Sequence, residues 1–460
     1  MSARSDAWAG ATSAFPMTAR GYEPRWNLAF VGILAYLTIE YTRLPAVYPV
    51  LLPLQLGKVA IIISAVGLAF ARRVRRSNLA ASLPIDVTVA FLMLACLLST
   101  FWARHQDLAW QGLADAVRCA LIYFLISRIV NSPWRLRAFL FVFLLLNFKI
   151  AQFGLRTYGV EVAAYNEEIV AVRGVGAGST GYFANSSDFG IAMDVAWAIA
   201  GVLLFALLKT KWRVLLVSIF LLFTIAILLC GSRGAVVGAG GIVAAAFVRN
   251  PRTRLAFPLM ALILVLGVIS VYPEASKERM RSALNWEQDP TASHRVMLWK
   301  AGMQMFADHT LVGVGPRNFG RVRRDNYPIP NPRVQNLASV AHSTYVEALT
   351  ETGLLGSVPL VLLGCFFFRL NSRTRKTLLA IGAEQRRSLE YCLSLGLDLA
   401  LVGYLVAGAF ASVLWYPHLW LLLGFSVALH SVASQKQQQE DTSRVRPPVA
   451  PGLWLQTSPR

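Results

Sequence analysis

Long apolar runs separated by short polar connections dominate the chain. Many of these runs approach the roughly 20 residues that a helix needs to cross about 30 Å of hydrocarbon. The pattern predicts an all-α, polytopic membrane protein with about twelve transmembrane helices. These are expected at residues 26–42, 48–71, 84–103, 108–127, 137–156, 188–208, 212–230, 232–248, 255–272, 344–368, 391–411 and 413–432.

The composition agrees with a membrane protein. Hydrophobic residues make up 56% of the 460 residues and charged residues only 15%, whereas charged residues approach about a quarter of a soluble domain. The five cysteines lie in or beside apolar runs, and their spacing matches neither a metal site nor a disulfide framework. We therefore expect packing cysteines, and neither a metal nor a cofactor.

Lys and Arg residues concentrate in every second connection. The connections between them hold at most one Arg each around 43–47, 104–107, 231–233 and 412–417. Because Lys and Arg accumulate in cytoplasmic loops, both termini are expected to be cytoplasmic. Much of the net charge of +20 then reflects topology, and nucleic acid is not an expected partner. The basic connections are 72–76, 128–137, 209–213, 249–254 and 369–376.

This topology divides the chain into segments with different expected roles. Both ends are expected to be disordered cytoplasmic tails, and the first lacks the apolar core of a signal peptide. The segments are a tail at 1–25, nine helices within 26–272 with an outer loop at 157–187, a large outer loop at 273–343, three helices within 344–432, and a tail at 433–460.

The large outer loop contains an amphipathic segment, "SHRVMLWKAGMQMFA", at 293–307. Its apolar positions recur at helical spacing, with Ser293 as the expected N-cap. Gly313 and Gly315 follow, and they permit a tight turn and close approach of the backbone to a ligand. The expected apolar stripe consists of Val296, Trp299, Met303 and Phe306.

Arginine is abundant in this outer loop, where the positive-inside rule gives no reason for it. Guanidinium groups bind phosphate oxygens bidentately, so the loop is expected to meet a phosphate or pyrophosphate. Arg317 is a candidate for substrate binding. His309 is another, unless it only fixes the loop through its backbone. Arg321, Arg323 and Arg324 are expected to form a solvated or lipid-headgroup-facing patch.

The helix that follows begins with "AHSTYVEALTETGLLG". His342 lies at its entrance, where an imidazole can accept or donate a proton near neutral pH. Glu347 and Glu351 share one helix face at i, i+4 spacing. Carboxylates in such a place are costly unless they face a cavity, a cation or water. They are therefore candidates for substrate binding or for pairing with the arginines.

Arg233 lies at a tight turn between two apolar runs, on the same expected outer face. Gly234 and Gly238 are spaced so that neighbouring helices can pack closely beside it. Such a cation at the mouth of a helix bundle is suited to an anion. Asn185 and Asp188 are expected to cap the helix at 188–208.

Four segments, taken together, resemble the O-antigen ligase and O-antigen polymerase superfamily of bacterial envelope glycosyltransferases. The upstream "GYFANSSDFGIAM" at 181–193 is similar to an Asn-rich segment of that family, so the resemblance covers roughly 180–360. This chain has Thr310 after His309 where the family usually has Pro, and Ser343 after His342 where it usually has Asn. The four segments are "GSRGA" at 231–235, "HRVMLWKAG" at 294–302, "HTLVGVGPRNF" at 309–319 and "AHSTYVEALTETGLLG" at 341–356.

The resemblance implies an enzyme of the bacterial inner membrane. It would transfer a glycan from a polyprenyl (undecaprenyl) pyrophosphate carrier to a hydroxyl of a glycan, lipid A core or protein at the periplasmic face, by metal-independent inversion. Arg233 and Arg295 would hold the pyrophosphate leaving group, and His342 would orient or deprotonate the acceptor. The outer loops carry no Asp-x-Asp metal motif, which fits arginine as the charge stabiliser. Nothing in these residues decides between ligase and polymerase.

Two other classes of protein stay open. A transporter or flippase of lipid-linked saccharides also fits about twelve spans, and it would use ionisable residues within the membrane. No convincing repeat relates residues 26–208 to 212–432, however. The third possibility is a catalytically silent scaffold of the polysaccharide machinery. The expected intramembrane charges are Lys58, Asp115, Arg118, Lys149 and Asp194.

Overall fold

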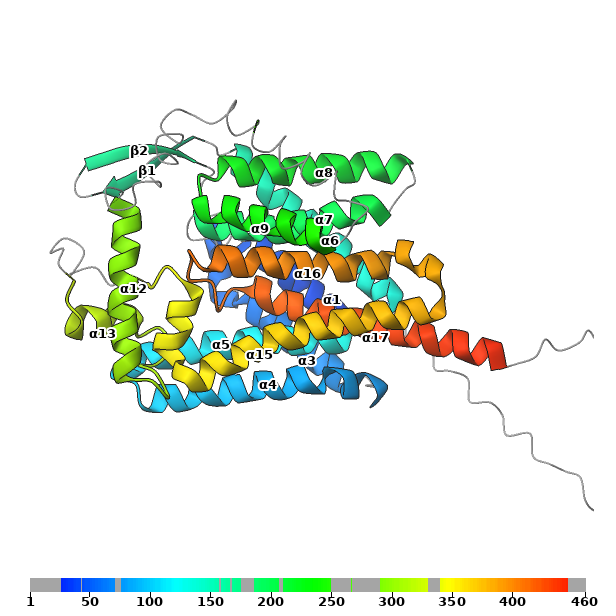
Figure 1. The fold of residues 1–460 in the computed structure, drawn as a ribbon, viewed down its shortest axis with the longest axis horizontal. Coiled ribbons are helices and arrows are strands. Elements are labelled where there is room, and N and C mark those ends of the chain that lie inside the picture. The colour runs from blue at the N-terminus through cyan, green and yellow to red at the C-terminus, as the bar shows by residue number, and fades with distance from the viewer. Residues whose placement is uncertain are drawn as a thin grey trace, which may run out of the picture.

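The computed structural model consists mainly of long helices that run roughly side by side, with a small group of helices across one end (Figure 1). We call this the α12 end, after the helix α12 (Pro290–Asp308) that stands across it. The residues described are 26–42, 44–70, 76–156, 159–165, 168–174, 186–206, 210–249, 290–329 and 340–445, together with Leu266.

The helices of the first half alternate in direction along the bundle, as short connections between long helices require. They are α1 (Leu28–Thr42), α2 (Leu44–Val47), the 3-10 helix η1 (Pro49–Leu54), α3 (Leu56–Phe70), α4 (Arg76–Phe101), α5 (Gln106–Ile129), α6 (Pro133–Arg156), α7 (Ser186–Ala206), α8 (Thr210–Leu229) and α9 (Arg233–Arg249).

The second half adds the α12 end and three further long helices. Besides α12 these are α13 (Phe319–Asn326), α15 (Thr344–Ile381), the 3-10 helix η4 (Ala383–Arg387), α16 (Leu389–Gly408) and α17 (Pro417–Val445). Each apolar run expected to be a span coincides with a helix, except 255–272, which lies outside the described residues apart from Leu266.

The chain is a multi-pass membrane protein by the length and composition of its helices. In the described part, seven helices are long and apolar enough to cross a membrane, and Leu28–Thr42 and Arg213–Leu229 are shorter apolar helices. The number of about twelve spans therefore remains a prediction. The seven are Pro49–Phe70, Ser82–Phe101, Pro133–Arg156, Ser186–Leu204, Thr344–Ile381, Leu389–Gly408 and Pro417–Arg444.

The described elements of secondary structure are helical, as the all-α fold class predicts, except in one segment. Strands β1 (Gly159–Tyr165) and β2 (Glu168–Gly174) form an antiparallel hairpin in the outer loop expected at 157–187, with Gly159 opposite Gly174 and Tyr165 opposite Glu168. Val160, Val162, Ile169 and Val170 supply the β-branched residues that favour strands. Each strand has only seven residues, so its sequence pattern did not stand out beside the long apolar runs.

The two helices nearest the C-terminus are longer than expected. α15 continues past the expected end at 368 to Ile381, and α17 continues past 432 to Val445. Residues 433–445 are therefore helical instead of a disordered tail. Their stability has a local cause: Arg444 pairs with Glu440 at 3.4 Å with i, i+4 spacing, and Lys436 reaches Glu390 of α16 at 3.8 Å.

Burial within the bundle identifies its centre. α7 is the most enclosed of these spans, because 89% of its most apolar 18-residue stretch is buried. It packs against α16, α8 and α9. Large apolar side chains point outward from the peripheral helices, among them Phe91 of α4, Phe141 of α6 and Val361 of α15. This distribution is that of a bundle surrounded by lipid.

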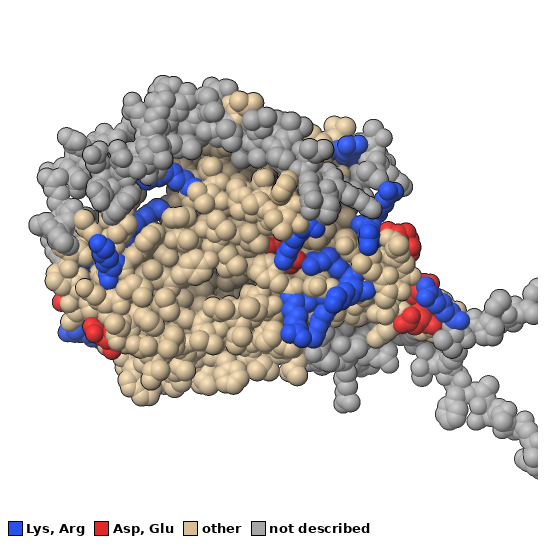
Figure 2. Space-filling model, viewed as in Figure 1, with Lys and Arg blue, Asp and Glu red and all other residues tan. Residues whose placement is uncertain are grey.

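The basic connections of the described part meet at the end opposite α12. There Asp398 of α16 binds Arg249 of α9 at 2.8 Å and Arg375 of α15 at 2.9 Å. Figure 2 shows a group of Lys and Arg side chains at this end, and a smaller group at the α12 end. Arg249 and Arg375, which belong to two of the basic connections, thus lie together at one end of the bundle.

Candidate functional site

α12 begins earlier than the sequence pattern predicted, at Pro290. Proline is favoured at the first helical position because its missing N–H would have no intrahelical partner there. Ser293 is consequently inside the helix, and the prediction that it is the N-cap is wrong. The buried face of α12 also differs from the predicted apolar stripe. Leu298, Ala301 and Met305 are buried, whereas Met303, which was expected on the stripe, is 46% exposed.

A small hydrophobic core joins α12 to its neighbours. It is separate from the main core of the bundle, and it fixes α12 and α13 on the N-terminal turns of α15. Gly302 of α12 allows this contact, because a Cβ there would lie 2.6 Å from a methyl group of Val346. The core consists of Leu298, Met305, Val314, Phe319, Val322 and Ala341, with Tyr327 and Val346 packed against it.

α15 is broken at Gly353, whose φ of 60° and ψ of −160° leave the helical region. The loop after α12 completes the broken backbone: Leu354 N–H donates to the Thr310 carbonyl at 2.8 Å, and Val314 N–H donates to the Thr350 carbonyl at 2.9 Å. A Cβ at Gly353 would overlap the Leu311 carbonyl oxygen. The Gly-x-Gly turn therefore approaches α15, although a ligand was expected there.

Glu351 holds the same loop with its side chain. Its carboxylate accepts the backbone N–H of Arg317 at 2.9 Å and that of Phe319 at 3.2 Å, and it is only 4% exposed. Asn318 fixes the other side of the loop, since its side-chain amide exchanges hydrogen bonds of 3.1 Å with the backbone of His105. Glu351 thus fixes the conformation of this loop through the loop's backbone N–H groups.

His342 is held at the start of α15 in a strained conformation. Its φ of 50° lies in the left-handed region, which costs a non-glycine residue about 1–3 kcal/mol. Its neighbours hold the backbone in place: Trp299 Nε1 donates to the Ala341 carbonyl at 3.1 Å, and Ser343 caps α15 by accepting the Val346 N–H at 3.5 Å. Such strain is typical of positions at which a side chain must be aimed.

Two imidazoles and two guanidiniums gather around this point. We call His294, Arg295, Arg323 and His342 the imidazole–guanidinium cluster. The rings of His294 and His342 lie 6.5 Å apart, centroid to centroid, at 77°. Arg323 is fully buried, which is rare for an arginine. The cluster joins α12, α13 and the entrance of α15, which are separate in sequence.

The electrostatics of the cluster favour an anion. Burial, followed by Arg295 and His294, lowers the pKa of His342 from 6.5 to about 4. Burial, followed by Arg323 and Arg295, lowers the pKa of His294, and burial followed by Arg324 lowers the pKa of Arg323. Besides the effect of His294 on His342, the charged groups that shift these two pKa values are the guanidiniums of Arg295 and Arg323. Both rings are therefore neutral at pH 7, beside permanent positive charge.

Arg233 begins α9 at the same end of the bundle. A Cβ on the next residue, Gly234, would lie 3.2 Å from Phe410, and the Phe410 ring lies 6.5 Å from that of Trp299, one helical turn after Arg295. Gly238 packs closely too, since a Cβ there would meet Ala407 at 2.9 Å. The two glycines thus allow close helix packing, as predicted. This chain of contacts connects Arg233 to α12.

Two carboxylates and a phenol lie close together where α7, α15 and α17 begin. Glu347 is one helical turn inside α15 from His342, and its Oε2 is buried without a hydrogen-bond partner among the described residues. Asp188, in the first turn of α7, accepts the hydroxyl of Tyr416 at 2.8 Å. Burial and then Asp188 raise the pKa of Tyr416. Asn185, the other expected cap, lies outside the described residues.

Other predicted site residues lie away from the cluster. His309 is exposed at the far end of α12, about 20 Å along the helix axis from Arg295 at 1.5 Å per residue. Arg317 binds Asp115 of α5 at 2.6 Å and Gln111 at 3.3 Å. Asp115, expected as an intramembrane charge, is thereby tied to the loop at the α12 end.

The expectation of a solvated patch is wrong for Arg323 and fits the other two residues. Arg321 pairs with Asp107 at 3.6 Å and Arg324 with Asp325 at 3.2 Å, all with partly exposed side chains. Arg323 shares a helix face with Phe319 and Val322, both in the small core. That i, i+4 spacing from Phe319 was the signal that the residue is buried. His294 carried no such signal, because only the fold brings it to His342.

Metal-ligating groups are a further possibility for such a site. Among the described residues, no group of three or more His, Cys, Asp and Glu side chains is arranged to hold a metal ion. The chemistry of the cluster itself is that of anion binding by guanidinium and of proton transfer by a neutral imidazole.

Comparison with known families agrees with the resemblance in the sequence. Residues 217–361 match the family described as O-antigen ligase. This segment begins within α8 and ends within α15, so it includes Arg233, the whole cluster and the loop held by Glu351. No curated protein matches the chain. The chain therefore carries, over residues 217–361, a domain of the O-antigen ligase family.

Proposed function

We propose that this protein transfers a glycan from a polyprenyl-pyrophosphate carrier to an acceptor hydroxyl, as a ligase or polymerase of envelope polysaccharide. The main supporting observation is the imidazole–guanidinium cluster, which lies within the segment that matches the O-antigen ligase family. The cluster offers permanent positive charge for a pyrophosphate and a neutral base for an alcohol, the two groups that this transfer requires.

The leaving group is the carrier pyrophosphate. As the bond between the anomeric carbon and the phosphate oxygen breaks, negative charge grows on the pyrophosphate. Arg295 and Arg233 stabilise that charge, with Arg323 contributing from its buried position beside His294. Guanidiniums fixed by the protein need little reorganisation during the reaction, so they stabilise the transition state more than water does. No divalent cation is required in this scheme.

The acceptor hydroxyl reacts at the same anomeric carbon. His342 accepts its proton as the new bond between oxygen and carbon forms, and attack from the face opposite the pyrophosphate inverts the configuration. An imidazole with a pKa of about 4 is a weak base in the free protein. Arrival of the pyrophosphate places negative charge beside it and raises that pKa, so the base strengthens when the donor is bound.

The orientation in the membrane follows from the charge distribution. Positive connections mark the cytoplasmic side, and in the described part they meet at the end opposite α12. We therefore place the cluster at the periplasmic face of an inner membrane, where carrier-linked glycans are used. Both termini are then cytoplasmic.

A complementation assay tests this function in cells. In a strain lacking its own copy, the wild-type gene is expected to restore surface polysaccharide. Arg233→Ala, Arg295→Ala and His342→Ala are each expected to reduce it by about 100-fold or more at normal protein level. His309→Ala is the matched control, since its exposed side chain lies at the other end of α12. Full polysaccharide in all three variants would refute the proposal.

A transport assay separates this function from the flippase alternative. Vesicles containing the purified protein and carrier-linked glycan are expected to form a covalent product with the acceptor, without nucleotide and in the presence of a chelator. Movement of the carrier lipid between leaflets, without product, would instead identify a transporter.

A further inference from the structure

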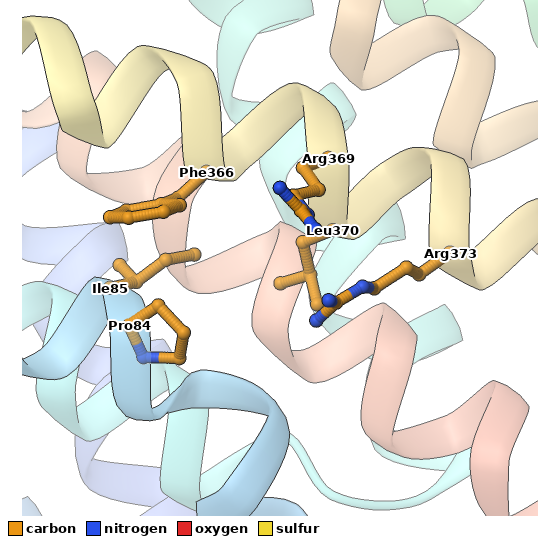
Figure 3. Close-up of a pocket in the computed structure, with 6 residues that line it drawn as sticks. All are labelled: Pro84, Ile85, Phe366, Arg369, Leu370 and Arg373. Atoms are coloured by element: carbon orange, nitrogen blue, oxygen red, sulfur yellow. The ribbon is translucent and has the colours of Figure 1, made fainter.

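A cavity of about 160 Å³ opens between α4 and α15 at the end opposite the cluster. Figure 3 shows that its side chains come from these two helices, with an apolar part around Phe366 and two arginines beyond it. Nothing in the proposed transfer uses this place. The lining residues are Pro84, Ile85, Phe366, Arg369, Leu370 and Arg373.

The position of the cavity along α15 matches a membrane interface. From the break at Gly353, the roughly 20 residues to Arg373 rise about 30 Å, the thickness of the hydrocarbon layer. If Leu354 lies near one boundary, Arg369 and Arg373 lie near the other, at the depth of lipid headgroups. They are one helical turn apart on one face of α15.

The acids near this cavity already have partners. Asp86 of α4 binds Arg128 at 2.6 Å and Tyr123 at 2.7 Å. Asp398 and Glu390 bind other cations of this end: Arg249 and Arg375 for the first, Arg137 and Lys436 for the second. Among the described residues, Arg369 and Arg373 make no ion pair. Two adjacent guanidiniums thus face the cavity without a carboxylate.

The walls and surroundings of the cavity are apolar. Ile85 and Leu370 are buried at its base. Outward from it, Leu83 of α4 is 56% exposed and Val361 of α15 is 68% exposed, as expected for side chains that contact acyl chains. A soluble anion would gain nothing from these walls. A ligand with an anionic head and an apolar tail would use both the arginines and Phe366.

We propose that this cavity binds an anionic phospholipid of the leaflet opposite the cluster. Its phosphodiester lies between Arg369 and Arg373, and an acyl chain lies along Phe366 and Ile85. Basic pockets between transmembrane helices recognise anionic headgroups in this way. The site is separate from that of the carrier pyrophosphate, at the other end of α15. The bound lipid would hold α4 against α15, the helix that begins just after His342.

Lipid binding to the purified full-length protein tests the proposal directly. In detergent, phosphatidylglycerol is titrated and the lipid-bound fraction is measured by native mass spectrometry. Arg369→Ala/Arg373→Ala is expected to weaken binding by about 30-fold, as the loss of two interfacial cations predicts. Lys376→Ala is the matched control, because this exposed cation of the same helix end does not line the cavity. It should bind like the wild type.

Two further arms identify the ligand. Phosphatidylcholine, with the same chains and a zwitterionic head, should bind about as weakly to the wild type as phosphatidylglycerol binds to the double alanine variant. Inorganic phosphate should not displace the lipid, because it lacks the chain. Arg369→Lys/Arg373→Lys keeps the charges and should retain most of the affinity, which also guards against misfolding of the alanine variant. Equal binding by wild type and double alanine variant, equal binding of both lipids, or displacement by phosphate would overturn the proposal.

Discussion

The backbone N–H of Arg317 donates to the carboxylate of Glu351 at 2.9 Å, while the guanidinium of Arg317 turns away to Asp115 at 2.6 Å. Both residues were expected to bind substrate, and Glu351 alternatively to pair with one of the arginines. Instead, Glu351 orders the loop between α12 and α13 through the backbone, and Arg317 ties that loop to α5. A carboxylate within a transmembrane helix is thus used to build the scaffold of the site.

Replacing Glu351 is expected to destabilise the fold of the α12 end. Glu351→Gln keeps one acceptor oxygen but turns an amide group toward the second N–H, so one buried donor is left unsatisfied. The expected loss is about 1–3 kcal/mol, measured as a lower midpoint of thermal unfolding in detergent. Glu347→Gln is the control, because Glu347 Oε2 has no hydrogen-bond partner among the described residues. Equal midpoints for the two variants would contradict the role given to Glu351.

The break in α15 predicts a strong contrast between two glycines of one helix. Gly353→Ala places a Cβ against the Leu311 carbonyl at a φ of 60°, so we expect severe loss of folded protein. Gly364→Ala meets nothing within 4 Å and improves helix propensity. Size-exclusion profiles and unfolding midpoints of both variants check this. A Gly353→Ala protein as stable as Gly364→Ala would mean that α15 is continuous.

The lowered pKa of His342 predicts an unusual pH profile. With a pKa of about 4, the imidazole of the free protein stays neutral from pH 8 down to about pH 5. At pH 5.5 an ordinary histidine would be only about one tenth neutral. We expect kcat/KM for the donor, which reports the free protein, to stay nearly flat over this range and to fall only toward pH 4. The profile of His309→Ala should be unchanged. A wild-type profile that falls near pH 6.5 would argue against His342 as the proton acceptor in this environment.

Arg323 and Arg321 are two residues apart, but we expect only the replacement of Arg323 to weaken donor binding. Arg323→Leu removes a fully buried cation beside His294, so donor affinity should fall by about tenfold or more. Arg321→Ala removes only an exposed ion pair with Asp107 and should leave the donor affinity close to that of the wild type. Titration of donor lipid against both variants measures the difference. Similar affinities would place Arg323 outside the binding site.

The sequence predicted the helical architecture well, because apolar runs of membrane length have few alternative structures. It also singled out Arg295 and His342, since each belongs to a recognisable local motif. What it missed depends on contacts between distant segments. The burial of Arg323 required α13 to pack on α12, and the break at Gly353 required the loop after α12 to bind its backbone. Within "ETGLLGSVPLVLLG" nothing local marks that glycine as different from Gly356 or Gly364.

The central claim is that Arg295 binds the carrier pyrophosphate while His342 serves the acceptor, and one measurement separates these roles. Purified wild type, Arg295→Ala and His342→Ala are compared for binding of a carrier-linked glycan and for its transfer to acceptor. The account predicts that His342→Ala binds donor within about twofold of wild type but forms about 100-fold less product, whereas Arg295→Ala loses both. Wild-type rates of transfer by His342→Ala, or undiminished donor binding by Arg295→Ala, would contradict it.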